Sequence, residues 1–443
     1  MAWAQDSLAE RTRQYFLDIA RLDTTNPPGN ETRVARYLQQ VAEREGIVCE
    51  LLGPDPSRLN FVARLNGTGG GRPLLLMAHT DVVPAEAAHW TVPPFSAELH
   101  EGYFYARGAV DDKSLLAAEL AVLVELKRAG RPPVRDVILL AEADEEAASS
   151  GIQWMVENAW KKIDAEFALN EGGLAMDLPS GTRVYQIQTA EKIPTPIVVR
   201  AGGTAGHGSL PLADNPVVRV ARALVQLAEA DMPVRLNGTT RRYLNEISKL
   251  DEYRWLAPLV PRLHRADAAR AAANEIRQRD RELDAQLRTT VSPDVMHAGS
   301  VVNVIPASAE ALVDVRRLPD ETSEEVVARL RKIVHDTGIE VLPLAGHNMP
   351  ATGPSSLSTA LYKAMESVLR AAAPGALVVP YMQRGATDGS YLRRKGMAVY
   401  GVPLFVREDH ENRAHGTDER ISTAMLDEGV HTLWKIVISV ATR

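Results

Sequence analysis

Two short segments with continuous apolar centres constrain the fold of this 443-residue chain more than any other feature. Residues 73–78 read PLLLMA, and residues 134–143 read VRDVILLAEA. Such runs are typical of strands that are buried on both faces of a parallel sheet. Amphipathic segments at 5–22, 31–45 and 117–130 predict helices that alternate with these strands. Strands that alternate with helices indicate a doubly wound α/β sheet.

The pattern changes near residue 191 and returns near residue 351. Residues 194–203 predict a new strand that enters a glycine-rich turn, and residues 240–290, rich in Arg, Ala, Glu and Leu, predict a helical stretch. We therefore expect an α+β domain at 191–350, inserted into an α/β domain with a mixed sheet that 1–190 and 351–443 form together.

Composition excludes several classes of protein. The net charge of −7 argues against a nucleic-acid partner. The single cysteine, Cys49, allows neither an intramolecular disulfide nor a thiolate zinc cage. No window approaches 18 consecutive apolar residues, and the N-terminus lacks a basic segment followed by an apolar run. We therefore expect a cytoplasmic protein with no membrane partner.

Charged residues stand where the first apolar run ends. His79 follows that run directly, and Asp81 comes two residues later. Ligands bind outside the carboxyl ends of strands in open α/β sheets, and a neutral imidazole at that place can bind zinc. Asp81 could then hold the second ring nitrogen. By itself, the pair favours an ordinary surface turn.

Acidic residues follow in three further places. Asp111 and Asp112 precede the helix at 117–130, where one of them could instead be a helix N-cap. Glu145 and Glu146 end the second apolar run, although they could also form the acidic first turn of a helix. Two adjacent carboxylates allow one to bind a metal while the other takes a proton from water. Glu171 ends another apolar run before a glycine turn.

A late polar loop adds His410 and His415, each of which could be an ordinary surface histidine. The combination of histidine, aspartate and glutamate at several strand ends is more specific than any one of them. Oxygen and imidazole ligands without sulfur suit zinc, cobalt or manganese. A carboxylate that bridges two such cations is a design found in hydrolases.

The chain resembles the M20 family of metallopeptidases, whose members include aminoacylase-1, glutamate carboxypeptidase, succinyl-diaminopimelate desuccinylase and acetylornithine deacetylase. The resemblance covers nearly the whole chain and keeps the order of the motifs. The matching segments are HTDVVP (79–84), WTVPPF (90–95), GYFYARGAVDDK (102–113), DEE (144–146), NEGG (170–173), GHGSLP (206–211), NVIP (303–306), DVR (314–316) and HGTDER (415–420).

The resemblance implies two divalent metal ions, zinc first and cobalt or manganese as alternatives. It implies that Glu145 is the general base and that Asp81 orients a histidine ligand. Asp111 would bridge the two ions. The implied metal ligands are His79, Asp111, Glu146, Glu171 and His415.

In the inserted domain, the resemblance implies a lid that often forms a homodimer. His207 would help to stabilise an oxyanion, and Asn303 and Arg316 would bind the substrate carboxylate, with Arg317 as a possible substitute for Arg316. Thr387 lies in a segment similar to a family substrate loop. Three positions depart from the family pattern: Gly208 after His207, Ala147 after the glutamate pair and Ser114 after Lys113.

These features favour an amidohydrolase that cleaves an amide bond next to a free carboxylate, as in N-acyl amino acids or the C-terminal bond of a peptide. A dipeptidase or general carboxypeptidase of the same family is the alternative. A non-catalytic metal-containing binding module is a different class, against which the intact Glu145 argues. The apolar residues at 255–263 could form lid core or line a pocket for an acyl group.

Overall fold

The computed structural model of the chain describes residues 2–346, 349, 351–407 and 413–442, with side chains from residue 7 onward. It contains two compact units. Unit 1 comprises Met1–Thr189, Ser355–Tyr381 and Thr387–Arg443, and unit 2 comprises Ala190–Pro354 and Met382–Ala386. The inserted domain expected at 191–350 agrees with most of unit 2, which also includes Ala190, residues 351–354 and Met382–Ala386.

The described part of unit 1 is built on one large mixed sheet, as the sequence predicted. Its strand order is β1-β2-β6-β3-β7-β18-β9-β8-β19, with β17 paired to β9. Strand β3 lies between β6 and β7 and is parallel to both, whereas β1, β2 and β6 pair in antiparallel fashion. The strands are β1 (Val48–Leu52), β2 (Asn60–Leu65), β3 (Leu74–His79), β6 (Val137–Glu142), β7 (Phe167–Asn170), β8 (Leu174–Asp177), β9 (Arg183–Glu191), β17 (Leu377–Gln383), β18 (Ala398–Gly401) and β19 (Val406–Arg407).

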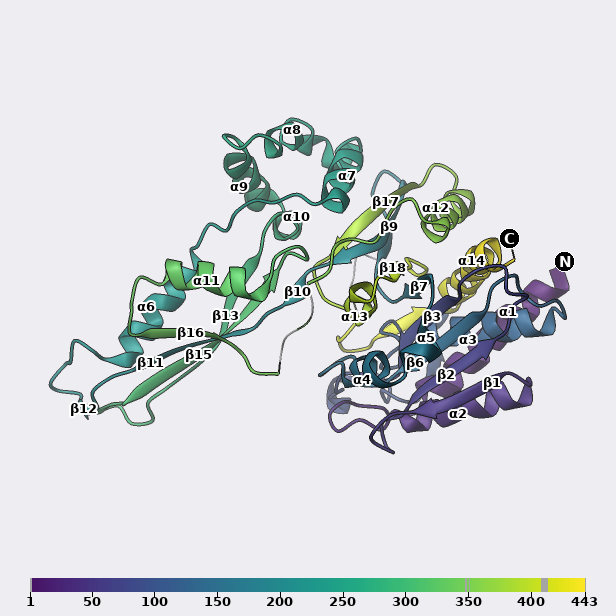
Figure 1. Cartoon of the computed structure of the whole chain (residues 1–443), viewed down its shortest axis with the longest axis horizontal. Helices are drawn as coiled ribbons and strands as arrows, with labels where there is room; N and C mark the ends of the chain where they lie inside the picture. Colours follow the sequence, from purple (N-terminus) through teal and green to yellow (C-terminus); the bar gives the residue numbers. More distant parts are fainter. Residues whose placement is uncertain (1, 347–348, 350, 408–412, 443) are drawn as a thin grey trace. The chain divides into compact units, whose positions relative to one another are not determined.

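Helices cover both faces of this sheet (Figure 1). Leu74 and Leu76 of β3 belong to one hydrophobic core, and Leu75 and Met77 belong to a second. Alternate residues of a strand point to opposite faces, so the two cores lie on the two sides of a doubly wound sheet. The first core contains α1 (Ala2–Ala20), α2 (Thr32–Arg44), α3 (Lys113–Arg128), α12 (Ala360–Ala372) and α14 (Thr423–Ala441); the second contains α4 (Ser150–Asn158), α5 (Trp160–Ile163) and α13 (Gly389–Arg394).

A small antiparallel sheet joins segments of unit 1 that are far apart in the chain. Its order is β20-β5-β4, with β4 at Glu98–His100, β5 at Tyr103–Tyr105 and β20 at Arg420–Ser422. Arg420 pairs with Tyr105, and Ile421 pairs with Phe104. This pairing places the residues before β20 beside the residues after β5.

Unit 2 contains a five-stranded antiparallel sheet, covered on one face by α6 (Pro216–Ala228) and α11 (Ser323–Ile333) (Figure 1). Val199, Val313, Leu227 and Leu330 meet in the core between this sheet and the two helices. The strands are β10 (Ile193–Pro194), β11 (Ile197–Gly202), β13 (Thr290–Ala298), β15 (Ser308–Arg317) and β16 (Ile339–Pro343), and a separate pair is formed by β12 (Gly206–His207) and β14 (Val304–Ile305).

The predicted helical stretch at 240–290 folds into several short helices. The apolar residues Leu256, Leu259, Val260 and Leu263 are at most 5% exposed, so they belong to the interior of this stretch rather than line an open pocket. The helices are α7 (Gly238–Ile247), η2 (Asp251–Leu256), α8 (Val260–Leu263), α9 (Ala269–Arg279) and α10 (Arg281–Ala285). Among the described residues of the whole chain, no helix is long and apolar enough to cross a membrane.

Candidate metal centre

His79 is the last residue of β3, and its side chain is buried. Its Nδ1 lies 3.0 Å from the carbonyl oxygen of Asp81, which can only accept a hydrogen bond. Nδ1 therefore carries the proton, and Nε2 has an open lone pair. That second nitrogen lies 2.9 Å from Oδ1 of Asp111. A histidine ligand is commonly fixed in this way by a hydrogen bond at its other nitrogen.

The carboxylate of Asp81 has a different set of partners. It lies 3.5 Å from Nδ1 of His79 and accepts hydrogen bonds from the backbone N–H groups of Glu145 and Glu146, each at 3.1 Å. Asn26 donates to it at 2.7 Å. Burial raises the pKa of Asp81, but its interactions with His79 and Asn26 outweigh that effect and lower the pKa. Asp81 thus fixes both the imidazole, through its carbonyl group, and the turn that carries the two glutamates.

Asn26 extends this network in a way that the sequence did not reveal. Its side-chain amide also donates to Asp144 at 2.8 Å. Asp144 in turn accepts a hydrogen bond from Arg58 at 2.7 Å, and Arg58 contacts the buried Glu31. Residues 24–31, TTNPPGNE, are rich in turn-forming residues, and nothing local to that segment indicates these distant partners.

Five predicted ligands come together in two groups that share Asp111. His79, Asp111 and Glu171 form one group, and Asp111, Glu146 and His415 form the other; within each group the ligand atoms lie within 4.8 Å of one another. Nε2 of His415 lies 3.1 Å from Glu146 and 3.4 Å from Oδ2 of Asp111. The two oxygens of Asp111 therefore face two different imidazoles. His410, the alternative late histidine, lies outside the described residues.

The cluster concentrates negative charge. Burial, and next the carboxylate of Asp111, raise the pKa of Glu171 well above its usual value. Hydrogen bonds to Asp111 and Glu146 raise the pKa of His415 to about 10. The pKa of Asp111 is lowered because the two imidazoles outweigh the effect of burial. A bound cation would offset the repulsion among these clustered carboxylates and would accept the imidazoles as ligands.

The neighbours of the ligands occupy different positions. Glu145 lies in the turn after β6 and joins neither group of ligand atoms. Burial and the carboxylate of Glu171 raise its pKa well above the usual value. Asp112 is buried at the start of α3, and its side chain makes no capping hydrogen bond there. Neither residue is therefore a member of the clustered set, although both adjoin it in sequence.

In unit 2, the structure brings His207 and Asn303 together. His207 lies in β12 and pairs with Val304 of β14, and Gly208 donates its N–H to the carbonyl oxygen of Asn303 at 2.8 Å. A Cβ atom at residue 208 would lie 3.2–3.3 Å from the Asn303 backbone, which accounts for glycine at this departure from the family pattern. The imidazole of His207 is exposed, and its Nδ1 accepts from the hydroxyl and N–H of Ser209.

Arg316 and Arg317 differ sharply although they are adjacent in β15. Arg316 is partly exposed and contacts Asp314 through Nε at 2.9 and 3.0 Å. Arg317 is buried and donates to the Thr195 hydroxyl at 2.8 Å and to the carbonyl oxygens of Glu321 and Met349. Alternation along the strand places the two guanidinium groups on opposite faces. Arg317 is thus committed to the interior of unit 2 and is not a substitute for Arg316.

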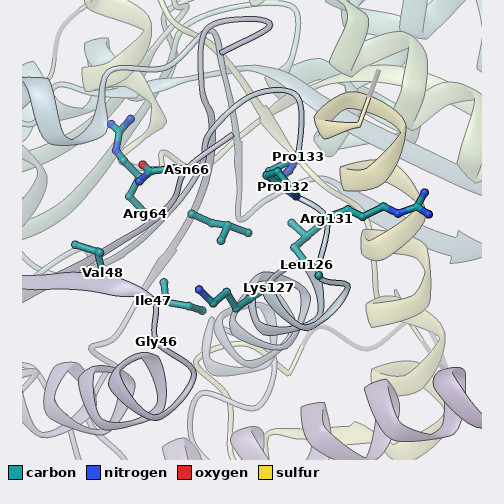
Figure 2. A pocket seen from close by; sticks show the side chains of 12 residues that line it. Gly46, Ile47, Val48, Arg64, Asn66, Leu126, Lys127, Arg131, Pro132 and Pro133 are labelled. Atoms are coloured by element: carbon teal, nitrogen blue, oxygen red, sulfur yellow. The ribbon is translucent and has the colours of Figure 1, made fainter. Parts of the chain in front are cut away.

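Unit 1 also has a separate pocket beside the turn between α2 and β1 (Figure 2). Its lining contains the basic residues Arg64, Lys127 and Arg131 and no acidic residue. Arg64 is paired with Asp136 at 2.6 Å, and Figure 2 shows Arg131 pointing away from the pocket. The lining contains no carboxylate, histidine or cysteine that would bind a divalent metal ion. Thr387, the remaining candidate from the sequence, is buried elsewhere, beside Gly389.

Comparisons with known proteins agree with the motifs. The family model of the peptidase family M20/M25/M40 matches residues 75–439. The human N-fatty-acyl-amino acid synthase/hydrolase PM20D1 is 26% identical over 378 residues, which cover 84% of this chain and 74% of that protein.

Two solved structures have the same fold. The M20 family metallo-carboxypeptidase Sso-CP2 of Sulfolobus solfataricus has a TM-score of 0.72 at 21% identity, covering 96% of this chain and 97% of that one. The YXEP protein of Bacillus subtilis, described as a dinuclear metal-binding peptidase, has a TM-score of 0.64 at 15% identity, covering 99% of this chain and 100% of that one.

Proposed function

Because the chain belongs to the peptidase family M20/M25/M40 and is a hydrolase of that family, we propose that it is a two-metal amidohydrolase that releases the acyl group of N-acyl amino acids. The observation that carries the proposal is the pair of ligand groups that share Asp111. Without a cation, the buried carboxylates of these groups would lack a compensating charge, and burying an uncompensated carboxylate costs several kcal/mol of folding free energy.

The donor set fits two divalent ions, with zinc first and cobalt or manganese as alternatives. His79, Asp111 and Glu171 would hold one ion. Asp111, Glu146 and His415 would hold the other. When bound, two such ions lower the pKa of a water molecule and polarise a carbonyl group.

Glu145 would be the general base. It adjoins the cluster in sequence but lies outside both ligand groups, so its carboxylate is available for proton transfer. It takes a proton from the attacking water, whose oxygen forms the new bond to the amide carbon. It then delivers that proton to the amine nitrogen as the C–N bond breaks. Asp81 would keep Glu145 in place through the 3.1 Å hydrogen bond to its backbone N–H.

Unit 2 would supply the contacts to the substrate. Arg316 is the natural partner for the α-carboxylate, because a guanidinium matches a carboxylate with two parallel hydrogen bonds. Only Nε of Arg316 contacts Asp314, so its terminal nitrogens can serve a ligand. Asn303 would assist at the carboxylate, and the exposed His207 would donate to the developing oxyanion from the nitrogen opposite Ser209.

The similarity to an N-fatty-acyl-amino acid synthase/hydrolase favours N-acyl amino acids over peptides. Carboxypeptidase activity is the second candidate, and the likeness to a metallo-carboxypeptidase is the observation that favours it. Both reactions need the same free α-carboxylate and differ only in what lies on the other side of the amide bond.

A substrate panel tests the proposal directly. Purified protein is assayed with N-acyl amino acids from acetyl to oleoyl and with matched dipeptides, before and after treatment with a chelator and after addition of zinc, cobalt or manganese. We expect chelator-sensitive hydrolysis, with higher kcat/KM for the N-acyl amino acids. Faster dipeptide hydrolysis would favour the carboxypeptidase. No metal-dependent hydrolysis of any amide would favour the binding module.

A further inference from the structure

We propose that Arg107 and Glu419, which form a buried ion pair, are positioning residues. They hold the backbone at Asp111 and His415 so that both side chains can bind the metal ions. The inference rests on the proposed function, since it assumes that these two residues are ligands. Neither Arg107 nor Glu419 belongs to the two ligand groups. Their guanidinium and carboxylate are joined at 2.7 Å, and both side chains are at most 3% exposed.

Glu419 fixes the backbone that leads to Asp111. Its Oε1 accepts hydrogen bonds from the N–H groups of Val110 at 2.7 Å and of Asp111 itself at 3.1 Å. Its Oε2 accepts from the N–H of Gly108 at 3.0 Å and from Arg107. One carboxylate thus binds three backbone N–H groups within four residues. The conformation of the segment that carries the shared ligand depends on it.

Arg107 reaches the other side of the centre. Its second terminal nitrogen lies 3.3 Å from the carbonyl oxygen of His415 and 3.4 Å from that of Pro84, which ends the segment that begins with His79. Its guanidinium also lies over the ring of Trp90, 5.2 Å from the ring centroid. A single side chain therefore contacts the segments of two predicted histidine ligands while it binds Glu419.

His415 has a particular need for such a contact. Its φ of 62° lies in the left-handed region, which residues with a side chain adopt only when their surroundings require it. Asp418 has a φ of 54° in the same turn, and its carboxylate accepts hydrogen bonds from the N–H and the hydroxyl of Thr91. The loop that carries His415 is thus held in an uncommon backbone conformation from two directions.

Fold stability alone is a weak reason for this ion pair. The pairing of β20 with β5 and the hydrogen bond from Ala106 N–H to the Glu419 carbonyl oxygen, at 3.0 Å, already join the two segments through the backbone. Apolar residues of similar volume often replace a buried ion pair without loss of stability. The hydrogen bonds of the pair instead converge on backbone groups of Asp111 and His415, as expected of residues that orient ligands.

Substitutions of the two residues should change metal affinity in different ways. Glu419→Gln puts an amide N–H₂ against backbone donors and loosens Asp111, which both ligand groups share. Arg107→Lys keeps the positive charge beside Glu419 but cannot reach two carbonyl groups as well, so it loosens mainly His415. We expect Glu419→Gln to weaken both metal sites about 10–100-fold, and Arg107→Lys to weaken chiefly one of them.

The experiment is a titration of the metal-free full-length protein with Zn²⁺ and Co²⁺ by calorimetry, together with the visible spectrum of the Co²⁺ form. Melting of the metal-free protein reports folding separately. Glu125→Gln is the control, because it breaks a part-buried arginine–glutamate pair of unit 1 that touches neither ligand group, Arg11–Glu125 at 2.7 Å. It should leave the affinities and the Co²⁺ spectrum unchanged.

A double variant covers the case in which the single variants fail to fold. Arg107→Met with Glu419→Leu removes both charges together, so no unpaired charge stays buried and the metal-free protein should still fold. Its melting temperature should be lower than that of the wild type, because the N–H groups of Gly108, Val110 and Asp111 lose their acceptor. It should still lose metal affinity and change the Co²⁺ spectrum. Wild-type affinity in this variant or in the folded single variants would overturn the positioning role. If the wild-type protein binds no divalent ion at all, the proposed function fails instead, which separates the two failures.

Discussion

The clustered residues of unit 1 and the predicted substrate residues of unit 2 are built in opposite ways. His79 is buried and fixed by the hydrogen bond at Nδ1, and Asp111 is fixed at its backbone N–H while its two carboxylate oxygens face two imidazoles. In unit 2, His207 is exposed and contacts its neighbour Ser209, and Arg316 contacts Asp314, two residues away on its own strand.

The difference follows from what each set must do. Carboxylates repel one another, so a cluster of them has to be held together by the surrounding structure before a cation arrives. A residue that recognises a substrate carboxylate gains its partner only on binding, and it needs donors that are still accessible. Four tests, taken in order of expected effect, ask whether the two regions divide the work in this manner.

The largest effect should come from Glu145→Ala. Loss of the general base should lower kcat by about 10²–10⁴-fold. The metal content should stay at the wild-type value, because Glu145 joins neither ligand group. Steady-state kinetics and metal analysis of the same preparation measure both quantities. Glu157→Ala, at an exposed position of α4, is the control. Near-normal turnover of Glu145→Ala would contradict its role.

Two histidine variants should differ within unit 1. His415→Ala should abolish tight binding of one ion and lower the melting temperature of the metal-free protein only modestly, because the His415 side chain is 53% exposed and solvent screens its contacts with Asp111 and Glu146. His79→Ala should also weaken metal binding, but it should lower that melting temperature more, since it empties a buried position. Calorimetric titration and thermal melting separate the two. Two tightly bound ions in His415→Ala would remove it from the ligand set.

The adjacent arginines of β15 give a matched pair in unit 2. Arg316→Met should raise KM about 10–100-fold through loss of a charged hydrogen bond, with little change in kcat or melting temperature. Arg317→Met should leave KM unchanged. It should lower the free energy of unfolding by about 3 kcal/mol, because it leaves buried acceptors without a partner. An unchanged KM in Arg316→Met would argue that another residue binds the substrate carboxylate.

The smallest effect concerns the pH dependence of unit 2. Burial, and next the charge of Arg316, lower the pKa of Lys192 to about 7, although Asp284, Asp314 and Glu321 oppose this. The folded state therefore binds fewer protons than the unfolded state between pH 7 and the ordinary lysine pKa. Stability should rise with pH across that window. Lys192→Met should remove this part of the slope when melting is measured from pH 6 to about pH 10. An identical slope in both proteins would contradict the prediction.

The sequence predicted β3 and β6 of the unit 1 sheet because these two strands are buried on both faces and read as continuous apolar runs. Chemistry at the ends of those runs also made His79, Glu146 and Glu171 recognisable. Strand β13 was not predicted, since Thr290–Ala298 contains Pro293, which disfavours a strand. It is tolerated here at a register shift, between Pro293 and Val295, in a strand that pairs on one side with β15.

The supporting network could not be predicted in the same way. The hydrogen bond from Asn26 to Asp81 spans 55 residues, and the one from Arg107 to Glu419 spans 312 residues. Arg107 and Glu419 do lie inside the quoted motifs, so their presence there was the available signal. No local pattern, however, tells which backbone group a buried arginine or glutamate will meet. Several candidate ligands can be recognised from the sequence because they follow strand-like runs. The hydrogen bonds that hold them in place depend on tertiary contacts.

The two ligand groups are completed at different points of the chain. His79, Asp111 and Glu171 all precede unit 2, whereas His415 and Glu419 follow it. During synthesis, the ribosome must therefore release all of unit 2 before the second group of ligands can exist. A nascent chain that ends within unit 2 can hold at most the first group. Pairing Arg107 with Glu419 joins residues more than 300 positions apart, and contacts of such long separation form slowly during folding.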